Sequence, residues 1–284
     1  MKNRKRIAIA VALAALGLCR SPDVAAEELK GSLQIKGSDT MVNLCQAWAE
    51  AFMARHPQVT VAITGGGSGT GIAAFISGTA DLASASRKMT QKEAQASAAQ
   101  GRPVQEWAVA LDGLAVVVHP SNSVKRLTMQ QLADLFTGKI RTWRALGGSD
   151  QTVVLLSREV NSGTHVYFKE HVLGSGGEFA PEALLMPSSQ AIADEVTSNP
   201  AVIGYYGMGY LNPKNAAVAI ATSAADAYVT PSEESVRSGA YPIARPLFFY
   251  TPGNLQGAAK AFVDFVLSPE GQEIVRKMDF VPVK

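Results

Sequence analysis

Short apolar runs alternate with longer amphipathic stretches along most of this chain, which is the pattern of an α/β protein. In the first part, residues 33–37, 59–63 and 81–84 are predicted to be strands, with helices between and after them. The first helix ends near Arg55, because its apolar residues recur at spacings of three and four up to that point. Residues 114–118 form a continuous apolar run, as in a strand buried on both faces.

The apolar run is interrupted at Pro120, and the polar stretch 121–126 after it predicts a crossing into a second lobe. Within that lobe, the same periodicities predict two strands and three helices, at 153–156 and 203–206 and at 128–136, 166–172 and 188–198. Residues 219–246 contain few long apolar runs and are predicted to carry the return crossing. A strand at 247–250 and two helices then complete the chain.

A chain that leaves one lobe in mid-sequence and returns near its end builds two lobes joined by two strands. The predicted first lobe comprises residues 27–117 and 246–284, and the second comprises residues 118–245 with the return crossing. In such α/β architectures, ligands bind in the cleft where strands end and helices begin. We therefore expect the functional residues to lie between the lobes.

Residues 1–26 have the features of a signal peptide for export. Four of the first six residues are cationic, and residues 7–18 form an apolar run of 12, shorter than the roughly 20 residues that cross a bilayer. Val24-Ala25-Ala26 offers small residues for cleavage after Ala26. Lipid attachment at Cys19 is an alternative, which the bulky residue before it disfavours. Both outcomes predict an exported protein.

Composition and charge argue against a nucleic-acid-binding function. The 284 residues are 47% hydrophobic and 18% charged, as in a globular protein. The formal net charge is +2, but the first 26 residues hold five of the 26 Lys and Arg and one of the 24 Asp and Glu. The remaining chain carries 21 basic and 23 acidic residues and so has no overall basic character.

The cysteine and histidine residues predict neither a catalytic thiol nor a metal site. Cys45 lies on a predicted helix with no histidine near it in sequence, and we expect a small buried apolar residue there. His165 and His171 are six residues apart, a spacing that does not place both on one helical face. No further cysteine or histidine supports them as zinc ligands, and no cofactor is implied.

Three segments share a design that suits the binding of an anion. Each places small hydroxyl residues and glycines after a predicted strand and before a predicted helix, at 37–41, 65–71 and 158–164. A helix N-terminus offers unpaired N–H groups, Ser and Thr add short donors, and glycine lets an anion approach the backbone. Three such segments converging on one point would surround a tetrahedral oxyanion with donors, and Arg158 would add a charged contact.

Each segment alone has a simpler interpretation, because Ser or Thr before a helix is usually an ordinary cap. The glycine-rich segment lacks the Lys-Ser/Thr ending of phosphate-binding nucleotide loops, so nucleotide binding is not supported. A secreted phosphatase or other phosphoryl-transfer enzyme would need metal ligands or an activated nucleophile, and the sequence shows neither. A scaffold or adhesin that keeps the fold is a third alternative. The three segments together favour anion binding.

With residues 110–114 and Trp143, these segments resemble the PstS-type periplasmic phosphate-binding proteins of ABC importers, over nearly the whole chain after the signal. The resemblance implies a two-lobed α/β periplasmic binding protein fold (type II-like) with two hinge-strand crossings. It implies a monomeric, periplasmic, non-enzymatic protein without a cofactor, which captures inorganic phosphate and delivers it to an ABC permease at the inner membrane. The ligand-binding residues it implies are Thr40, Met41 (through its backbone), Ser68, Arg158, Ser162, Gly163 and Thr164.

The chain departs from the family pattern at one place. Many members carry an aspartate after the third strand, which accepts the proton of hydrogen phosphate and rejects sulfate. Here Ser86 stands at that position with Arg87 beside it, and we include both in the predicted phosphate site. Asp39 and Asp112 are possible replacement proton acceptors, although a helix cap and a turn residue are equally good interpretations of them. Another tetrahedral oxyanion (sulfate, molybdate or arsenate) is therefore the main alternative ligand.

Overall fold

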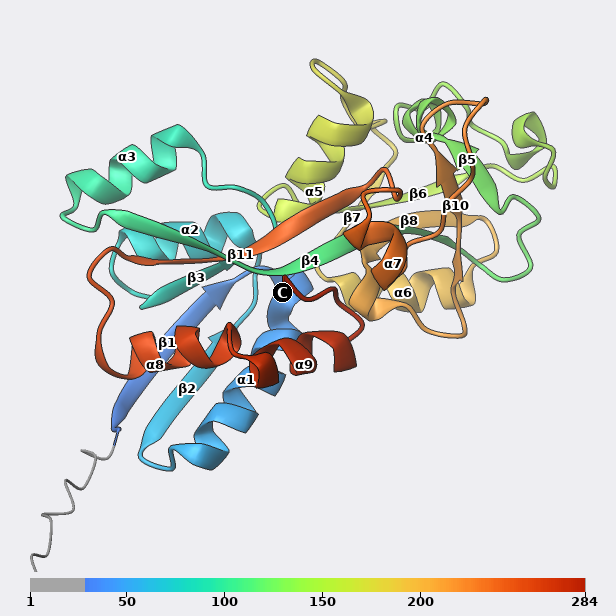
Figure 1. The fold of residues 1–284 in the computed structure, drawn as a ribbon. Coiled ribbons are helices and arrows are strands. Elements are labelled where there is room, and N and C mark those ends of the chain that lie inside the picture. Colours follow the sequence, from blue (N-terminus) through green and yellow to red (C-terminus); the bar gives the residue numbers. More distant parts are fainter. Residues whose placement is uncertain (1–28, 284) are drawn as a thin grey trace, which may run out of the picture.

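The computed structural model describes residues 29–283, and one long twisted sheet runs through both halves of the molecule (Figure 1). Its strand order is β2-β1-β3-β11-β4-β8-β6-β7, with β9 paired to β4 beside this path, while β5 and β10 form a separate pair. The strands are β1 (Gly31–Gly37), β2 (Val59–Thr64), β3 (Leu82–Ala85), β4 (Val104–Val118), β5 (Arg126–Thr128), β6 (Val154–Arg158), β7 (Leu184–Met186), β8 (Val202–Gly207), β9 (Ala216–Ala217), β10 (Ala219–Ala221) and β11 (Ala244–Pro252).

Helices cover both faces of this sheet (Figure 1). The α-helices are α1 (Val42–Arg55), α2 (Ser68–Ile76), α3 (Gln91–Ala99), α4 (Met129–Phe136), α5 (Gly163–Phe168), α6 (Ser189–Ser198), α7 (Glu233–Arg237), α8 (Gly257–Val266) and α9 (Pro269–Lys277). Three 3-10 turns and a π-helix complete the described elements: η1 (Asp39–Met41), η2 (Trp143–Leu146), η4 (Met208–Tyr210) and the π-helix η3 (Lys169–Leu173).

Lobe 1 is built on β2, β1, β3, β11 and the first part of β4. Successive side chains of a strand point to opposite faces of a sheet, and β11 shows this alternation. Leu247 and Phe249 belong to the core that α1, α8 and α9 cover, while Phe248 and Tyr250 pack on the other face with α2. Cys45 is fully buried in the first of these cores, which confirms its predicted role as a small apolar residue.

Lobe 2 repeats this arrangement on the second part of β4 with β8, β6 and β7. Val117 and Tyr206 lie on the face that α6 covers. On the opposite face, Tyr205 stacks on Phe168 with ring centroids 3.9 Å apart and contacts Phe136 of α4 edge-on at 5.5 Å. Aromatic packing of Phe168 against β8 and α4 therefore fixes the position of α5. This is the helix of the predicted anion-binding segment 158–164.

Strand β4 connects the two lobes without interruption. Its residues 104–113 pair antiparallel with β11, and residues 114–118 pair with β8. On this pairing we propose 114–243 as lobe 2, a few residues earlier than the limits expected from sequence. The polar stretch after Pro120, where the sequence pattern suggested the crossing, follows a strand that already lies in lobe 2. Because the chain crosses inside a strand, no polar linker marks the crossing in the sequence.

Two element boundaries also differ from the sequence-based expectations. Strand β4 begins at Val104 rather than within the apolar run, because its first part is stabilised by pairing with the distant β11. Helix α5 begins at Gly163 and passes into the π-helix η3, whereas a single helix over 166–172 was expected. The other predicted strands and helices lie within a few residues of their expected positions.

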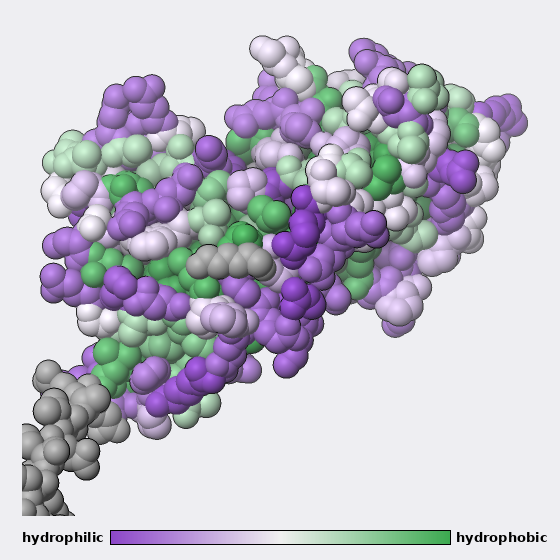
Figure 2. All heavy atoms as spheres, viewed as in Figure 1, coloured by the Kyte–Doolittle hydropathy of each residue, from purple (hydrophilic) through white to green (hydrophobic). Residues whose placement is uncertain are grey.

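The predicted signal peptide and Cys19 lie outside the described residues. Over residues 29–283, the structure contains no helix with the length and apolar character needed to span a membrane. The face of the molecule in Figure 2 is largely hydrophilic with small apolar areas, and a notch separates the two lobes between α3 and α5.

Gly37 ends β1 where only glycine fits. Its φ is +148°, and a Cβ would overlap the carbonyl oxygen of Ser84. We expect Gly37→Ala to lower the free energy of unfolding by about 3 kcal/mol or more, because the clash is with backbone that cannot rotate away. Gly101→Ala is the control, since Gly101 has φ +73° but no atom within 4 Å of a Cβ. Urea unfolding compares the two, and equal losses would contradict the prediction.

Candidate functional site

The segments predicted to bind an anion meet between the lobes. Strands β1, β2 and β3 are parallel neighbours, so the segments that follow them leave lobe 1 at the same edge of the sheet. Strand β6 of lobe 2 ends at Arg158. The segment after it packs against that edge, where the Asn161 carbonyl accepts from the Gly69 N–H and Thr164 hydrogen-bonds with Thr40. The convergence expected from the sequence is therefore present.

Hydroxyl groups from both lobes form one buried cluster. The Oγ1 atoms of Thr40 and Thr164, which belong to opposite lobes, are 2.8 Å apart. Ser86 Oγ lies 3.4 Å from Ser68 Oγ and 3.5 Å from Thr164 Oγ1. Ser162 caps the N-terminus of α5 beside them, and all five residues are at most 3% exposed. We call this set the hydroxyl cluster: Thr40, Ser68, Ser86, Ser162 and Thr164.

Three hydroxyl groups of the cluster already accept a hydrogen bond from an N–H group. Ser68 Oγ accepts from the Ser86 N–H at 3.0 Å, and Ser162 Oγ accepts from the Thr164 N–H at 3.2 Å. Thr164 Oγ1 accepts from Arg245 Nη2 at 2.9 Å. A hydroxyl group has one proton and two acceptor lone pairs, so each of these groups still has its proton to donate, either to a neighbouring hydroxyl group or to a ligand. The cluster is thus suited to a ligand that mainly accepts hydrogen bonds.

Gly163 brings the first turn of α5 directly against the cluster. A Cβ at this position would collide with Ser68 Oγ and lie 2.8 Å from Ser86 Oγ. Any larger residue would hold the two lobes apart at this point. The requirement for glycine in the segment 158–164 therefore follows from close approach between the lobes.

The guanidinium group of Arg158 is buried at the lobe boundary, with 1% of the side chain exposed. Its Nε donates to the Met186 carbonyl at 3.2 Å, its Nη2 to the Pro187 carbonyl at 2.9 Å and its Nη1 to Ser189 Oγ at 3.0 Å. Nη1 also lies 3.1 Å from Asp39 Oδ2 of lobe 1. Burial lowers the pKa of Arg158, and the Asp39 carboxylate opposes this shift.

Asp39 connects lobe 1 to lobe 2. Besides the ion pair with Arg158, its Oδ2 accepts from the Ser189 N–H at 2.8 Å, in the first turn of α6. The main-chain carbonyl of Asp39 accepts from the Tyr210 hydroxyl at 2.9 Å. Its carboxylate therefore lies beside the hydroxyl cluster, next in sequence to Thr40, and holds a cation there.

Arg245 is a residue of this region that the sequence analysis missed. Its Nε and Nη2 donate to Asp112 Oδ2 at 3.1 and 2.9 Å, while Asp112 Oδ1 accepts from the Met208 N–H at 3.0 Å. Burial raises the pKa of Asp112, and the charge and hydrogen bonds of Arg245 oppose the increase. The signal in the sequence was an aspartate within the mainly apolar run 107–118 and an arginine within the mainly apolar run 243–250.

Like Arg158, two other predicted site residues direct their donors to partners outside the cluster. Arg87 forms a two-point ion pair with Glu93 of α3, at 2.9 and 2.7 Å, and this hydrogen bonding raises the pKa of Arg87. The N–H of Met41, the predicted backbone donor, donates to the Ser38 carbonyl at 3.1 Å within η1. Met41 and Arg87 are sequence neighbours of the cluster members Thr40 and Ser86, but in the structure these donors do not reach the cluster.

The three arginines of this region are each paired with a carboxylate. The N···O distances are 3.1 Å for Arg158 and Asp39, 2.7 Å for Arg87 and Glu93, and 2.9 Å for Arg245 and Asp112. These six groups contribute no net formal charge. The site therefore presents oriented donors rather than an excess of positive charge.

Asn161 fastens the two lobes at the exposed rim of the site. Its carbonyl accepts from the Gly69 N–H at 2.9 Å, and its Nδ2 donates to the Gly66 carbonyl at 2.9 Å and to Thr70 Oγ1 at 3.2 Å. A Cβ at Gly67 would lie 2.8 Å from the Asn161 carbonyl oxygen, so the glycine-rich segment lets the two backbones meet. The sequence analysis included Asn161 in a loop but gave it no role.

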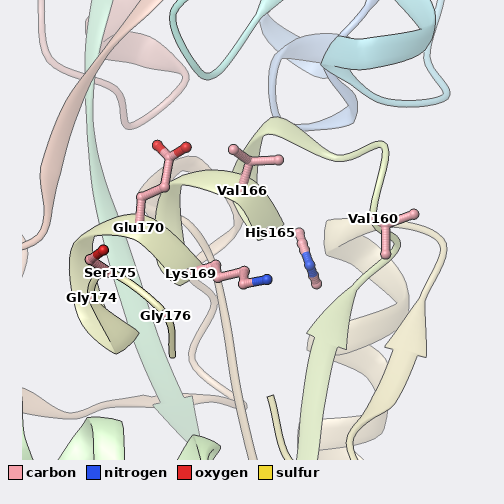
Figure 3. Close-up of a pocket in the computed structure, with 8 residues that line it drawn as sticks. All are labelled: Val160, His165, Val166, Lys169, Glu170, Gly174, Ser175 and Gly176. Atoms are coloured by element: carbon pink, nitrogen blue, oxygen red, sulfur yellow. The ribbon is translucent and has the colours of Figure 1, made fainter. Parts of the chain in front are cut away.

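A separate pocket of about 620 Å³ opens beside α5 and η3 (Figure 3). Figure 3 shows the His165 ring and the Lys169 side chain facing the same space, and Lys169 pairs with Glu178 outside it. None of the predicted site residues lines this pocket. Within residues 29–283, no three His, Cys, Asp or Glu side chains lie close enough together to hold a metal ion.

Known proteins are similar to this chain in sequence over nearly its whole length. The family model described as the PBP superfamily domain matches residues 24–270. The phosphate-binding protein PstS of Pseudomonas aeruginosa is 34% identical over 307 residues, which cover 98% of this chain and 95% of that protein. The phosphate-binding protein PstS of Bacillus subtilis is 33% identical, with 90% and 82% covered.

Solved structures of phosphate transport proteins have the same fold as this chain. A phosphate ABC transporter substrate-binding protein from Clostridium perfringens, with bound phosphate, is 34% identical and superposes with a TM-score of 0.82 over 89% of this chain and all of that one. An ABC-type phosphate transport receptor from Vibrio cholerae is 27% identical, with a TM-score of 0.72 and the same coverage. The two-lobed periplasmic binding protein fold expected from the sequence is thus confirmed, and the chain belongs to the PstS family of the PBP superfamily.

Proposed function

We propose that this protein captures inorganic phosphate between its lobes and delivers it to an ABC permease. The observation that carries the proposal is the hydroxyl cluster, in which N–H groups occupy the hydroxyl oxygens and leave the protons to be donated. Relatives about one-third identical are named phosphate-binding proteins, which supports phosphate as the anion. The proposed ligand-binding residues are the hydroxyl cluster with Gly163 and Arg158. Met41 and Arg87 are included on the family resemblance, although their donors have other partners in this structure.

Closure of the lobes completes the proposed site. Thr40, Ser68 and Ser86 belong to lobe 1, whereas Arg158 and the first turn of α5 belong to lobe 2. An anion that contacts both sets stabilises the closed arrangement, because the open one offers only half of the donors. In this proposal the exported protein works in the periplasm as a monomer, by binding and release without catalysis.

The proton of hydrogen phosphate needs an acceptor, and the two candidate carboxylates differ in how far they are already engaged. Asp112 accepts from Arg245 and Met208 with both oxygens. Asp39 uses Oδ2, while its Oδ1 has no hydrogen-bond partner among the described residues. We therefore propose Asp39 before Asp112 as the acceptor. Sulfate, which has no proton to give, would face this carboxylate oxygen without a hydrogen bond between them.

Calorimetric titration with phosphate, sulfate, molybdate and arsenate tests the proposed ligand. We expect phosphate to bind at least about 100-fold more tightly than sulfate, because sulfate leaves the carboxylate acceptor without a hydrogen bond and brings two negative oxygens together. Comparable binding of sulfate, unchanged in Asp39→Asn, would instead indicate a general oxyanion binder. Release of chromophore from a phosphate ester, in step with the purified protein, would favour an enzyme.

The two arginines predicted from sequence are expected to differ in importance. Arg158→Ala should weaken phosphate binding by about 10- to 100-fold or more, because a hydrogen bond from a buried charged group contributes about 1.5–3 kcal/mol. Arg87→Ala should weaken it by less than about threefold, because its guanidinium is engaged by Glu93 outside the cluster. Titration of both variants decides the matter, and equal losses would show that Arg158 is not the principal cation.

Asn161 is expected to set how long the lobes stay closed. Asn161→Ala removes the two Nδ2 hydrogen bonds to lobe 1, so phosphate should dissociate about 3- to 30-fold faster, at roughly 1 kcal/mol per hydrogen bond. The preference for phosphate over sulfate should not change, because no contact to the anion is lost. Asn212→Ala is the control, since its side-chain bonds stay within lobe 2. Stopped-flow release kinetics would contradict the idea if both variants matched the wild type.

A further inference from the structure

Asp112 and Arg245 face each other on the two strands that connect the lobes. They are directly paired in the β4–β11 ladder, two residues before β4 begins to pair with β8 of lobe 2. The Asp112 side chain is fully buried and that of Arg245 is 1% exposed, with Nη2 and Oδ2 2.9 Å apart. A buried ion pair thus lies at the point about which the lobes would move.

The guanidinium group of Arg245 reaches both lobes from this position. Its Nη1 donates to the Ser86 carbonyl of lobe 1 at 3.0 Å, and its Nη2 donates to Thr164 Oγ1 of lobe 2 at 2.9 Å. The Tyr167 ring of α5 lies against it, with the guanidinium carbon 5.3 Å from the ring centroid. One side chain therefore contacts the hinge and a site residue from each lobe.

We propose that Arg245, held by Asp112, is a positioning residue of the anion site. It acts through Thr164: by donating to Thr164 Oγ1, it directs the hydroxyl proton of Thr164 toward the anion, and by holding the Ser86 carbonyl it fixes the segment after β3. This inference rests on the proposed function, because it assigns Arg245 to the same anion site.

A purely structural role for Arg245 would require fewer hydrogen bonds than this side chain makes. Joining β4 to β11 requires only the contact with Asp112, and the backbone ladder between these strands already runs over nine residue pairs. The remaining donors of Arg245 instead go to Ser86 and Thr164, two members of the hydroxyl cluster. A planar group with five N–H donors can serve these partners at once, whereas a lysine ammonium cannot reproduce the same fork.

The carboxylate of Asp112 balances the positive charge of Arg245, so that the pair as a whole is neutral. An unpaired guanidinium buried at this position would carry an uncompensated charge, which is strongly unfavourable. With Asp112 in place, Arg245 orients a hydroxyl group and adds no net charge beside the anion.

A double-mutant cycle tests whether Arg245 acts through Thr164. Phosphate affinity is measured by calorimetry for the wild type, Arg245→Lys, Thr164→Val and the double variant, with Arg237→Lys as a control at an exposed ion pair. We expect each single variant to bind about 10- to 100-fold more weakly, as for the loss of one charge-assisted hydrogen bond. The double variant should be at most about threefold weaker than the weaker single variant, because both remove the same interaction.

The outcomes separate this inference from the proposed function. Losses that multiply in the double variant, or an Arg245→Lys variant that binds phosphate like the wild type, would overturn the positioning role while leaving phosphate binding intact. A coupling seen in urea unfolding of the anion-free proteins but not in affinity would reduce Arg245 to a structural residue. A wild-type protein that binds none of phosphate, sulfate, molybdate or arsenate would overturn the proposed function and this inference with it.

Asp112→Asn keeps the inference testable if Arg245→Lys does not fold. The variant retains an oxygen to accept from the Met208 N–H but leaves Arg245 without its counter-charge. We expect phosphate to bind at least about threefold more weakly, because Arg245 loses the carboxylate that holds its guanidinium group against Thr164. Binding that is unchanged or tighter would show that Asp112 does not hold Arg245 in place for the anion site, against the proposal.

Discussion

The hydrogen bonds that N–H groups donate to Ser68, Ser162 and Thr164 are the interactions on which the rest of the site depends. Each donor comes from a different part of the fold: the end of β3, the first turn of α5 and the start of β11. Strands β3 and β11 are neighbours in the sheet, which brings two of these donors together. The strand order thus brings two N–H donors to hydroxyl oxygens of the cluster, and a hydroxyl group without such a donor would accept from a ligand as readily as donate to it.

The pairing of arginines with carboxylates gives the site a particular electrostatic character. A buried guanidinium without a partner destabilises the folded protein, whereas a paired one costs less and still donates along fixed directions. Asp39 fulfils this role from lobe 1 and Asp112 from the hinge, so the chain uses acidic residues in a place that is suited to an anion. Recognition then depends on where donors point more than on attraction at a distance.

Sequence patterns located the elements and loops whose signals are local. Thr128 and Ser188 both cap the helices predicted to start there, and the three loops were recognisable because glycine and hydroxyl residues follow strands within a few positions. Arg245 was missed because its partners are distant: Asp112 is 133 residues away and Thr164 is 81. The first part of β4 was missed for the same reason, since it is a strand by virtue of pairing with β11. Contacts made across the fold leave no periodic trace in the sequence.

The position of β11 in the sheet also constrains how the chain assembles. With the limits proposed above, lobe 2 is one continuous stretch, 114–243, and its strand pairings close within that stretch. In lobe 1, by contrast, β11 lies between β3 and β4. These two strands are therefore joined into one sheet only when β11, near the end of the chain, pairs with both of them. A chain emerging N-terminus first can therefore complete its second lobe before its first, and the exposed edges of β3 and β4 must stay free of other strands in the meantime.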